Sequence, residues 1–288
     1  MKIDITNKDK ILFPKSKITK EDFCKYYEYI YKKMLSLIKD RPISQNRFPN
    51  GIDKKMFFQK KVLDYYPKWF KTIKVSRIDK KPISMAICND KDSLLYLANQ
   101  AIELHVFLSK KNNLNKPDRL IFDLDPSNKS FSYIIEAAND LKKLLDELKL
   151  PSFFMTTGSK GLHVIVPIKA EFDFEVIRAF AKKIAKILVN RYPKKYTIET
   201  LKSKRKNKIF IDYLRNSFAQ TTIAPYSIRA IENAPIATPI EFSELKKLKS
   251  SRAFNIKNIY KRKKDPFKNI DKKSKSLKSL IKKIDIMS

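Results

Sequence analysis

The hydrophobic pattern of the chain predicts three long amphipathic helices and one short helix. In each long stretch, apolar residues recur every three or four positions, which is the spacing of one face of an α-helix. The first helix begins at the polar residues 19–22, a sequence that favours a helix start. The predicted helices cover residues 19–39, 93–99, 130–148 and 172–190. The first helix should bury one face, made of Phe23, Tyr26, Tyr27, Ile30, Met34 and Ile38.

Short apolar runs between the helices predict strands, and residues 1–20 read as loop. The predicted strands cover residues 43–48, 56–59, 73–75, 84–88, 104–108, 119–125, 152–156, 162–167, 208–213 and 226–230. Helices and strands are interleaved without strict alternation, and no internal repeat is visible. This order favours an α+β fold with a mixed or antiparallel central sheet and flanking helices.

The charge of the chain indicates a polyanionic partner, most simply nucleic acid. There are 63 Lys and Arg residues against 30 Asp and Glu, so the net charge is 63 − 30 = +33. Such an excess attracts phosphate backbones. Compositional drift in an AT-rich genome is an alternative source of the lysines. Because 43% of the residues are hydrophobic, the chain can bury a core and is not a disordered basic tail.

The two cysteines and the N-terminus bear on the cellular compartment. Cys24 and Cys88 belong to no CxxC pair, so they predict buried thiols in a reducing compartment rather than a zinc site. The N-terminus has no apolar signal region, and no apolar run approaches the ~20 residues that span a membrane. We therefore expect a cytoplasmic protein without a membrane partner.

A glycine-containing loop is the first candidate for chemistry. The chain has only three glycines, and Gly158 and Gly161 both lie in the stretch TTGSKGLH, residues 156–163. Strands are predicted on both sides, so the loop should be a hairpin-like turn. Glycine permits positive φ and a close approach of a ligand to the backbone. With Lys160 and His163, backbone amides could bind a triphosphate. A purely structural role for His163 stays open.

Three aspartates in apolar strands are the second candidate. Asp123 and Asp125 are two residues apart in one strand, so their side chains point to the same face. Asp212 is a lone acid in another apolar strand. Like charges side by side repel each other unless something neutralises them, and divalent cations do this in phosphoryl transfer. The alternative is a strand that simply ends in a polar Asp-Pro turn.

These motifs together resemble the polymerase domain of the bacterial and archaeal end-joining ligase, ligase D, a branch of the archaeo-eukaryotic primase superfamily. The segments that carry the resemblance are RLIFDLDP (119–126), TGSKGLH (157–163), IDYLRN (211–216) and QTTIAPYSIR (220–229). It extends over nearly the whole chain, from residues 7–20 through Glu103-Leu-His105 to Asp265-Pro-Phe267. The family usually has tryptophan where this chain has Phe267. Residues 257–288 read by composition as a basic tail that ends in a short helix over residues 277–286. The resemblance implies instead that this segment closes the domain.

The resemblance implies a role for each matching residue. Asp123, Asp125 and Asp212 are implied as catalytic metal ligands for two divalent cations, Mn²⁺ or Mg²⁺. The implied nucleotide-binding residues are His105, Thr157 (where serine is usual), Lys160, His163, Arg215 and Arg229. A pocket for a DNA 5′-phosphate is implied at Asn7, Lys10 and Lys20. Template binding is implied at Arg47, Phe57 and Phe58.

The implied activity is template-directed addition of nucleotides, with ribonucleotides preferred, at gapped or broken DNA ends in non-homologous end joining. The implied partners are DNA ends with a 5′-phosphate, NTP or dNTP, Ku and a separate DNA ligase, and the implied location is the nucleoid. We expect one primase-polymerase domain, 1–288, with a DNA-end part (1–100), a catalytic core (101–250) and a closing segment (251–288). Stand-alone and excised forms stay open. The alternatives are a replicative or mobile-element primase-polymerase, a two-metal nuclease and a non-catalytic end-binding protein.

Overall fold

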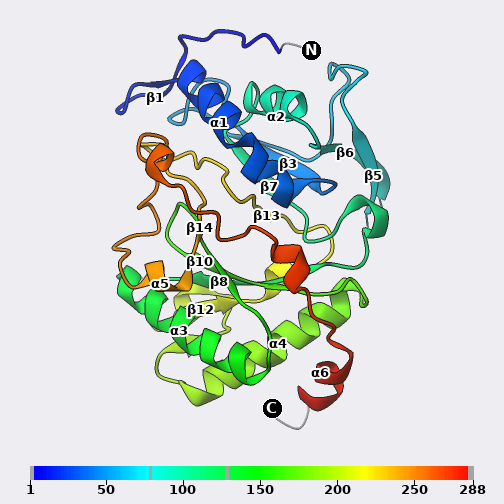
Figure 1. Ribbon diagram of the computed structural model, residues 1–288, viewed down its shortest axis with the longest axis vertical. Coiled ribbons are helices and arrows are strands. Elements are labelled where there is room, and N and C mark those ends of the chain that lie inside the picture. Colours follow the sequence, from blue (N-terminus) through cyan, green and yellow to red (C-terminus); the bar gives the residue numbers. More distant parts are fainter. Residues whose placement is uncertain (1–2, 78–79, 127–129, 285–288) are drawn as a thin grey trace. The chain divides into compact units, whose positions relative to one another are not determined.

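Two six-stranded sheets organise the chain, one in each of two units (Figure 1). The computed structural model describes residues 3–77, 80–126 and 130–284. The first unit comprises Met1–Asn112, Thr221–Thr238 and Phe254–Asp265, and the second comprises Asn113–Gln220, Pro239–Ala253 and Pro266–Ser288. Each unit thus combines segments that are far apart in the sequence. The division into three consecutive parts within a single domain stays a prediction.

The first unit begins with a small hairpin and the long helix α1 (Lys20–Ile38). A reciprocal pair of hydrogen bonds between Thr19 and Asp22 caps the helix, and its predicted apolar face is buried. The hairpin strands β1 (Ile11–Phe13) and β2 (Ile18–Thr19) lie in the stretch that was predicted as loop. That prediction was wrong because strands of three and two residues are too short to show a hydrophobic period.

The sheet of the first unit is antiparallel, in the order β13-β7-β3-β6-β5, and β4 pairs with β3. Its strands are β3 (Pro42–Arg47), β4 (Phe57–Gln59), β5 (Thr72–Arg77), β6 (Lys80–Ile87), β7 (Glu103–Val106) and β13 (Thr222–Ile223). The helix α2 (Lys91–Ala98) begins at the capping residue Asp90. The predicted strand at 226–230 is wrong. Tyr226 has a φ of 66°, which breaks an extended run, and only an isolated bridge joins Ile228 to Ile236.

The sheet of the second unit is mixed, in the order β11-β12-β8-β10-β9-β14. Its strands are β8 (Arg119–Asp125), β9 (Phe153–Thr156), β10 (Leu162–Pro167), β11 (Tyr196–Thr197), β12 (Ile209–Asp212) and β14 (Pro239–Ile240). Only β11 and β12 are parallel neighbours within this described sheet. The helices α3 (Phe131–Glu147) and α4 (Phe174–Arg191) lie on one side of it (Figure 1). The predicted α+β class is confirmed.

The C-terminal segment of the second unit is packed rather than solvated. Phe267 is fully buried, and its ring contacts Phe153 edge-on at 5.7 Å between centroids. Leu277 is also buried, next to the short helix α6 (Lys278–Lys283). The helix predicted at 277–286 is therefore present, and residues 285–286 lie outside the described residues. The remaining short helices are α5 (Phe242–Leu245), η1 (Lys111–Asn113), η2 (Lys202–Arg205), η3 (Leu214–Asn216), η4 (Ile259–Lys261) and η5 (Ile270–Lys273).

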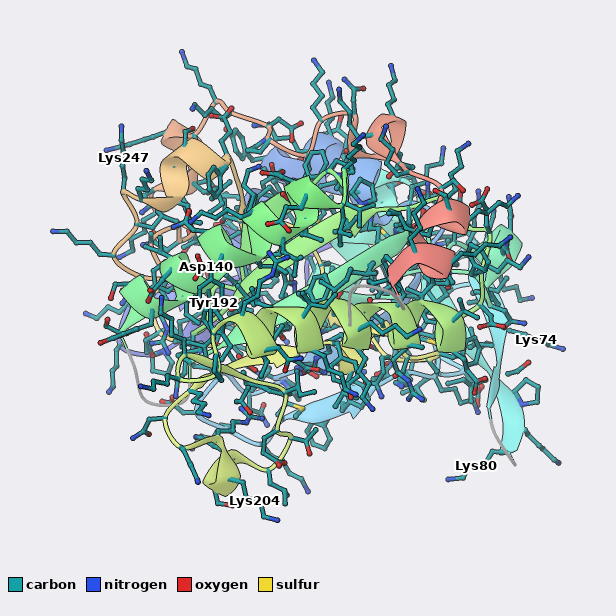
Figure 2. The ribbon with its side chains drawn as sticks, turned by 90° about the horizontal axis from the view of Figure 1, so that it is seen from below. Lys74, Lys80, Asp140, Tyr192, Lys204 and Lys247 are labelled. Carbon is teal, nitrogen blue, oxygen red and sulfur yellow. The ribbon has the colours of Figure 1, made fainter. Side chains whose placement is uncertain are left out.

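The labelled lysine side chains lie on the outside of the protein, and the two thiols are buried. The labelled lysines Lys74, Lys80, Lys204 and Lys247 extend outward from the ribbon (Figure 2). Both cysteines are buried and unlinked, as predicted, and burial raises the pKa of Cys24 to about 11. None of the helices in the described ranges is long and apolar enough to cross a membrane.

Candidate active site

Three neighbouring strands of the second unit bring two acids and a histidine into one row. Asp123 on β8 lies opposite His163 on β10 and opposite Asp212 on β12. Directly paired residues share a face of a sheet, and Asp125, two residues further along β8, shares it too. The opposite face of β8 carries Leu120, Phe122 and Leu124, which suit the apolar sides of α3 and α4. The structure thus brings the three predicted acids together with His163.

A histidine and an arginine side chain lie against these acids. His163 Nε2 is 3.5 Å from Asp123 Oδ2, and the histidine is buried. Arg215 Nε is 3.8 Å from Asp123 Oδ2 and 3.6 Å from Asp212 Oδ2. The other oxygen of Asp212 accepts a 2.7 Å hydrogen bond from the backbone N–H of Leu214. The arginine side chain is 42% exposed, so it can also reach an incoming anion.

The acids disfavour each other's charge. Burial raises the pKa of Asp125 to about 6, and the neighbouring charges of Asp123 and Asp212 contribute to the rise. Burial also raises the pKa of Asp212, assisted by Asp123 and opposed by the Leu214 hydrogen bond and Arg215. Buried carboxylates that lie this close together attract a cation, because its charge offsets their mutual repulsion.

The raised pKa of Asp125 predicts a specific pH dependence of stability without divalent cations. Its folded pKa of about 6 exceeds the ordinary aspartate pKa of 3.8, so between these values the native state binds more protons than the unfolded state. Stability therefore falls as pH rises through this window. Relative to Asp125→Asn, the wild type should lose roughly 2 kcal/mol of unfolding free energy between pH 4 and 7. Urea unfolding of both proteins in EDTA measures this difference, and parallel pH profiles would contradict it.

Within the described residues, no group of three or more His, Cys, Asp or Glu side chains could hold a metal ion by itself. Proteins also bind divalent cations through one or two carboxylates together with substrate phosphates. The oxygen donors and mutual repulsion of the aspartates fit a cation that binds together with a nucleotide.

Asn216 holds together the strand and the turn that carry the site residues, a role that was not predicted from the sequence. Its buried amide accepts from Ile121 N at 2.8 Å and donates to Ile121 O at 2.7 Å. It therefore continues the pairing of β8 beyond the end of β12. The same amide donates to Tyr213 O at 2.8 Å, which fixes the turn that carries Arg215. An asparagine in a loop gives no sequence signal for such a role.

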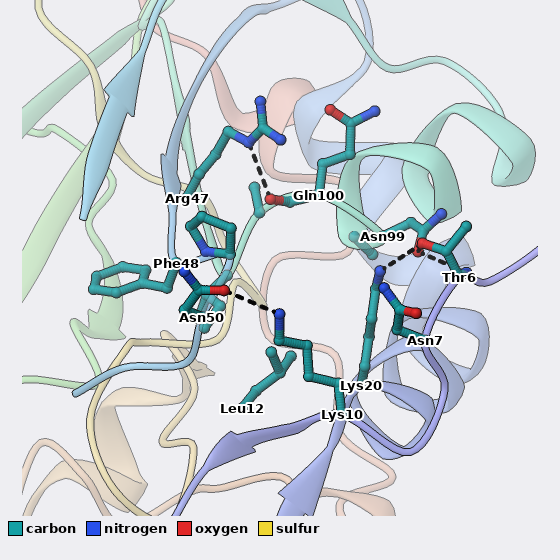
Figure 3. A pocket seen from close by; sticks show the side chains of 14 residues that line it. Thr6, Asn7, Lys10, Leu12, Lys20, Arg47, Phe48, Asn50, Asn99 and Gln100 are labelled. Carbon is teal, nitrogen blue, oxygen red and sulfur yellow. Dashed lines mark hydrogen bonds between the residues drawn. The ribbon is translucent and has the colours of Figure 1, made fainter. Parts of the chain in front are cut away.

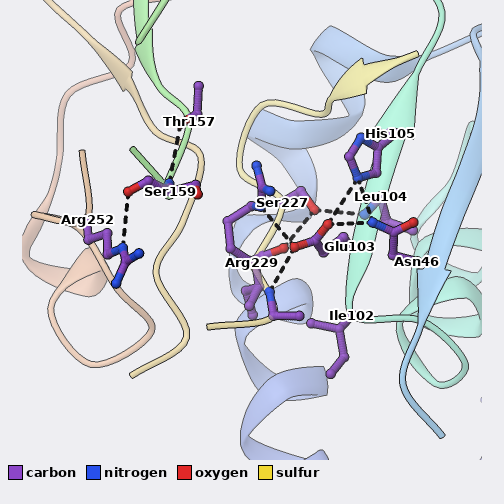
Figure 4. A network of polar contacts seen from close by, with 12 residues as sticks. Asn46, Ile102, Glu103, Leu104, His105, Thr157, Ser159, Ser227, Arg229 and Arg252 are labelled. Atoms are coloured by element: carbon purple, nitrogen blue, oxygen red, sulfur yellow. Dashed lines mark hydrogen bonds and ion pairs between the residues drawn. The ribbon is translucent and has the colours of Figure 1, made fainter. Parts of the chain in front are cut away.

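The glycine loop is a hairpin turn between β9 and β10, as predicted. The Thr157 hydroxyl accepts from Ser159 N at 3.3 Å and from Gly161 N at 3.2 Å. Ser251 donates to Gly161 O at 2.7 Å. Arg252 donates to Ser159 O at 3.1 Å (Figure 4). The loop is thus held from inside and from the segment 239–253. Its Lys160 is exposed.

The two glycines of this loop serve different needs. Gly158 has a φ of 67°, the left-handed conformation that the sequence suggested. A β-carbon on Gly161 would lie 2.4 Å from Leu124 O and 3.1 Å from Asp125 Oδ1. Gly161 is therefore required by the close approach of the loop to β8, the strand that carries the acids. A ligand's approach to the loop backbone stays a prediction.

The first unit contains a cationic pocket of about 420 Å³ (Figure 3). Asn7, Lys10 and Lys20 line it together with Arg47, and none of its lining residues is acidic. Lys10 Nζ donates to Asn50 Oδ1 at 3.2 Å and Lys20 Nζ to Thr6 Oγ1 at 3.0 Å, and both acceptors are neutral. Burial lowers the pKa of Lys20, and the charge of Lys10 lowers it further. The three cations therefore suit an anionic ligand.

The predicted template-binding residues lie at and beside this pocket. Arg47 Nε donates to Gln100 O at 3.2 Å, and its Nη1 donates to Gln59 Oε1 at 2.8 Å and to the Tyr65 hydroxyl. Phe57 and Phe58 on β4 are 49% and 55% exposed. Two exposed rings on consecutive residues of a strand point to opposite faces, and both are available for stacking.

His105 and Arg229 meet in the first unit at a buried glutamate, Glu103 (Figure 4). Arg229 Nε is 2.9 Å from Glu103 Oε1, and His105 Nε2 is 3.2 Å from Glu103 Oε2. Burial alone would raise the pKa of Glu103, but the His105 hydrogen bond and the Arg229 charge lower it to about 2. In the sequence, Glu103 stands out only as part of the motif Glu103-Leu-His105.

Known proteins are similar to this chain in sequence and in fold. A family model described as the LigD primase-polymerase domain matches residues 19–267. The Bifunctional non-homologous end joining protein LigD of Bacillus subtilis (strain 168) is 34% identical over 265 residues, which cover 91% of this chain and 42% of that protein. The Multifunctional non-homologous end joining protein LigD of Mycolicibacterium smegmatis is 32% identical over 248 residues, which cover 85% and 32%. The chain thus spans less than half the length of these curated relatives.

A solved structure supports the same assignment. The polymerase domain from Mycobacterium tuberculosis ligase D in complex with DNA superposes with a TM-score of 0.87 at 30% identity, covering 95% of this chain and 99% of that one. The predicted primase-polymerase fold is thereby confirmed. With its row of aspartates on a mixed sheet and a family match over most of its length, the chain belongs to the LigD primase-polymerase domain family, a family of nucleotidyltransferases.

Proposed function

We propose that the chain adds nucleotides, directed by a template, to DNA 3′ ends at gaps or breaks with a downstream 5′-phosphate. The observation that carries this proposal is the row of Asp212, Asp123 and His163 across three strands, with Asp125 on the same face. Membership of the LigD primase-polymerase family supports it. End joining is the process that we assign, because the curated relatives are named for it.

The acids are the proposed holders of two divalent cations, Mn²⁺ or Mg²⁺. The donor set fits, because Asp123, Asp125 and Asp212 supply carboxylate oxygens. Burial and the charge of Asp123 raise the pKa of Asp125 and Asp212, and a bound cation would relieve this repulsion. When bound, such ions favour attack of the primer 3′-hydroxyl on the α-phosphate and stabilise the leaving pyrophosphate.

The remaining polar residues are proposed to bind the nucleotide. In the second unit, Arg215 and His163 lie at the acids and Lys160 is exposed on the glycine loop. Thr157 acts through the shape of this loop, because its hydroxyl already bonds to the loop backbone. In the first unit, His105 and Arg229 are the proposed phosphate-binding side chains. Positive groups around a polyphosphate offset the charge that develops during transfer.

The first unit supplies the proposed DNA contacts. The pocket at Asn7, Lys10 and Lys20 is assigned to the terminal 5′-phosphate, and Arg47 with Phe57 and Phe58 to the template strand. The DNA complex of the M. tuberculosis domain supports DNA as a partner. A preference for ribonucleotides, and cooperation with Ku and a separate DNA ligase, are further parts of the proposal.

Primer extension on a gapped duplex tests this function against its rivals. Reactions with NTPs and with dNTPs, each with and without a primer 3′ end, should show addition that depends on the primer and on a divalent cation. Release of mononucleotides would instead indicate a two-metal nuclease. Chains begun without a primer would indicate a replicative primase-polymerase, and binding without any reaction would indicate an end-binding protein.

A further inference from the structure

Glu103 is a buried acid that connects two proposed phosphate-binding side chains from distant parts of the sequence. It lies at the start of β7, only 5% exposed, and contacts residues on β3, on β7 and in the segment 221–238. All of these residues belong to the first unit. The sequence motif gives Glu103 no role in the chemistry.

Both oxygens of the Glu103 carboxylate accept two hydrogen bonds. Oε1 accepts from Arg229 Nε at 2.9 Å and from Ala230 N at 3.0 Å. Oε2 accepts from Asn46 Nδ2 at 2.7 Å and lies 3.2 Å from His105 Nε2 (Figure 4). Four donors around one carboxylate fix both the position and the plane of the group.

The arrangement constrains its partners as strongly as it constrains Glu103. A guanidinium held at Nε cannot rotate its plane without losing that bond, and an imidazole that donates from Nε2 directs Nδ1 away from the carboxylate. Glu103 thus prepares Arg229 and His105 to meet an anion together.

We infer that Glu103 is a positioning residue for the nucleotide, holding Arg229 and His105 in the orientation that binds the triphosphate. The inference rests on the proposed function. It deepens that function, because it names the group that sets the geometry of two nucleotide contacts. A purely structural reading is that Glu103 only anchors the segment 221–238 through Ala230 N.

Glu232 is the matched control for that structural reading. It lies in the same segment and accepts hydrogen bonds from Lys15 N at 3.0 Å, Ser16 N at 3.1 Å and Ser16 Oγ at 2.8 Å. It thus anchors the segment at another point. Glu232→Gln should leave the KM for nucleotide within about twofold of the wild-type value, since removing hydrogen bonds at a partly exposed anchor affects mainly stability.

The test is a double-mutant cycle on nucleotide KM with saturating gapped DNA. Glu103→Gln keeps the shape of the side chain but removes its charge and replaces one of its two acceptor oxygens by an NH₂ donor, and should raise KM about 10- to 100-fold. In an Arg229→Ala background the same change should raise KM less than about threefold, because the two residues act as one unit. DNA affinity should change less than about twofold, and circular dichroism should show a folded protein. If Glu103→Gln does not fold, Glu103→Asp, which keeps the charge, should raise KM by an intermediate factor.

The outcomes separate this inference from the function on which it rests. If wild type neither binds nor adds nucleotide, the proposed function fails and the inference falls with it. If wild type adds nucleotide but Glu103→Gln leaves KM unchanged, only the inference is overturned. Independent, multiplying effects of Glu103→Gln and Arg229→Ala would likewise contradict positioning and support the anchor role.

Discussion

Asp123→Asn should lower the rate of nucleotide addition at least about 1,000-fold, because a central carboxylate of the acid row contributes several kcal/mol of transition-state stabilisation through bound cations. Asp123 lies between Asp212 and His163 and shares its face with Asp125, so no other acid in this described row occupies a comparable position. Asparagine keeps the shape of the side chain and removes one of three mutually repelling charges. The folded state should therefore be retained.

Asp140→Asn is the control for Asp123→Asn. Asp140 and Asp123 are both 8% exposed and both belong to the second unit, but Asp140 lies on α3 and accepts a 2.6 Å hydrogen bond from Tyr196. Its replacement should lower stability by about 1–2 kcal/mol and leave the rate of extension within about threefold of wild type. Primer extension and thermal melting measure both effects. Near-normal extension by Asp123→Asn would remove the acid row from the mechanism.

Wild type should bind a gapped duplex at least about tenfold more tightly when the downstream strand bears a 5′-phosphate, because a terminal dianion offers more charge and more acceptors than a diester. Lys10→Ala/Lys20→Ala should abolish this preference. Both ammonium groups line the pocket and hydrogen-bond only to neutral acceptors in the contacts described above. The preference should persist at moderate salt, whereas general attraction between a +33 protein and DNA falls steeply with salt.

Lys25→Ala/Lys32→Ala separates the pocket from bulk charge. These two lysines are exposed on α1 of the same unit and outside the pocket, so the variant loses the same charge. It should keep the 5′-phosphate preference while binding all DNA slightly more weakly. Competition binding with matched 5′-phosphate and 5′-hydroxyl gaps measures each protein. An equal loss of preference in both variants would show that Lys10 and Lys20 provide only basic surface.

The placement of the acids was predictable because it depends on local rules. Alternation along β8 puts Asp123 and Asp125 on one face, and a lone acid in an apolar strand marks Asp212. The register that sets Asp123 opposite both His163 and Asp212 was not predictable, because it depends on pairing between segments far apart in the chain.

Other parts of the fold carried too little sequence signal. β11, β13 and β14 have two residues each, fewer than any alternation needs to become visible. The run 226–230 has apolar residues at strand spacing, but the positive φ of Tyr226 makes it a turn. The residues around Lys10 and Lys20 did not distinguish them from other surface lysines. Only the family resemblance pointed to a phosphate pocket there.

The residues that support the site were the hardest to predict. Glu103 is a polar residue at the start of a strand, a position that many polar residues occupy. Its role is visible only from its contact with Arg229, which is 126 positions away in the sequence. Asn216 acts through the backbone of Ile121, 95 positions earlier. Such contacts between side chains that are distant in sequence have no local pattern, whereas chemistry that lies within one strand or loop does.

Single-nucleotide addition on four otherwise identical 5′-phosphorylated gaps, each with a different template base, tests the central claim most directly. Each nucleotide would be supplied alone, with a divalent cation, to wild type and to Asp123→Asn. We expect wild type to add the complementary nucleotide fastest on every template and Asp123→Asn to add none at a comparable rate. Addition that ignores the template base, or that survives in Asp123→Asn, would contradict a templated polymerase built on this acid row.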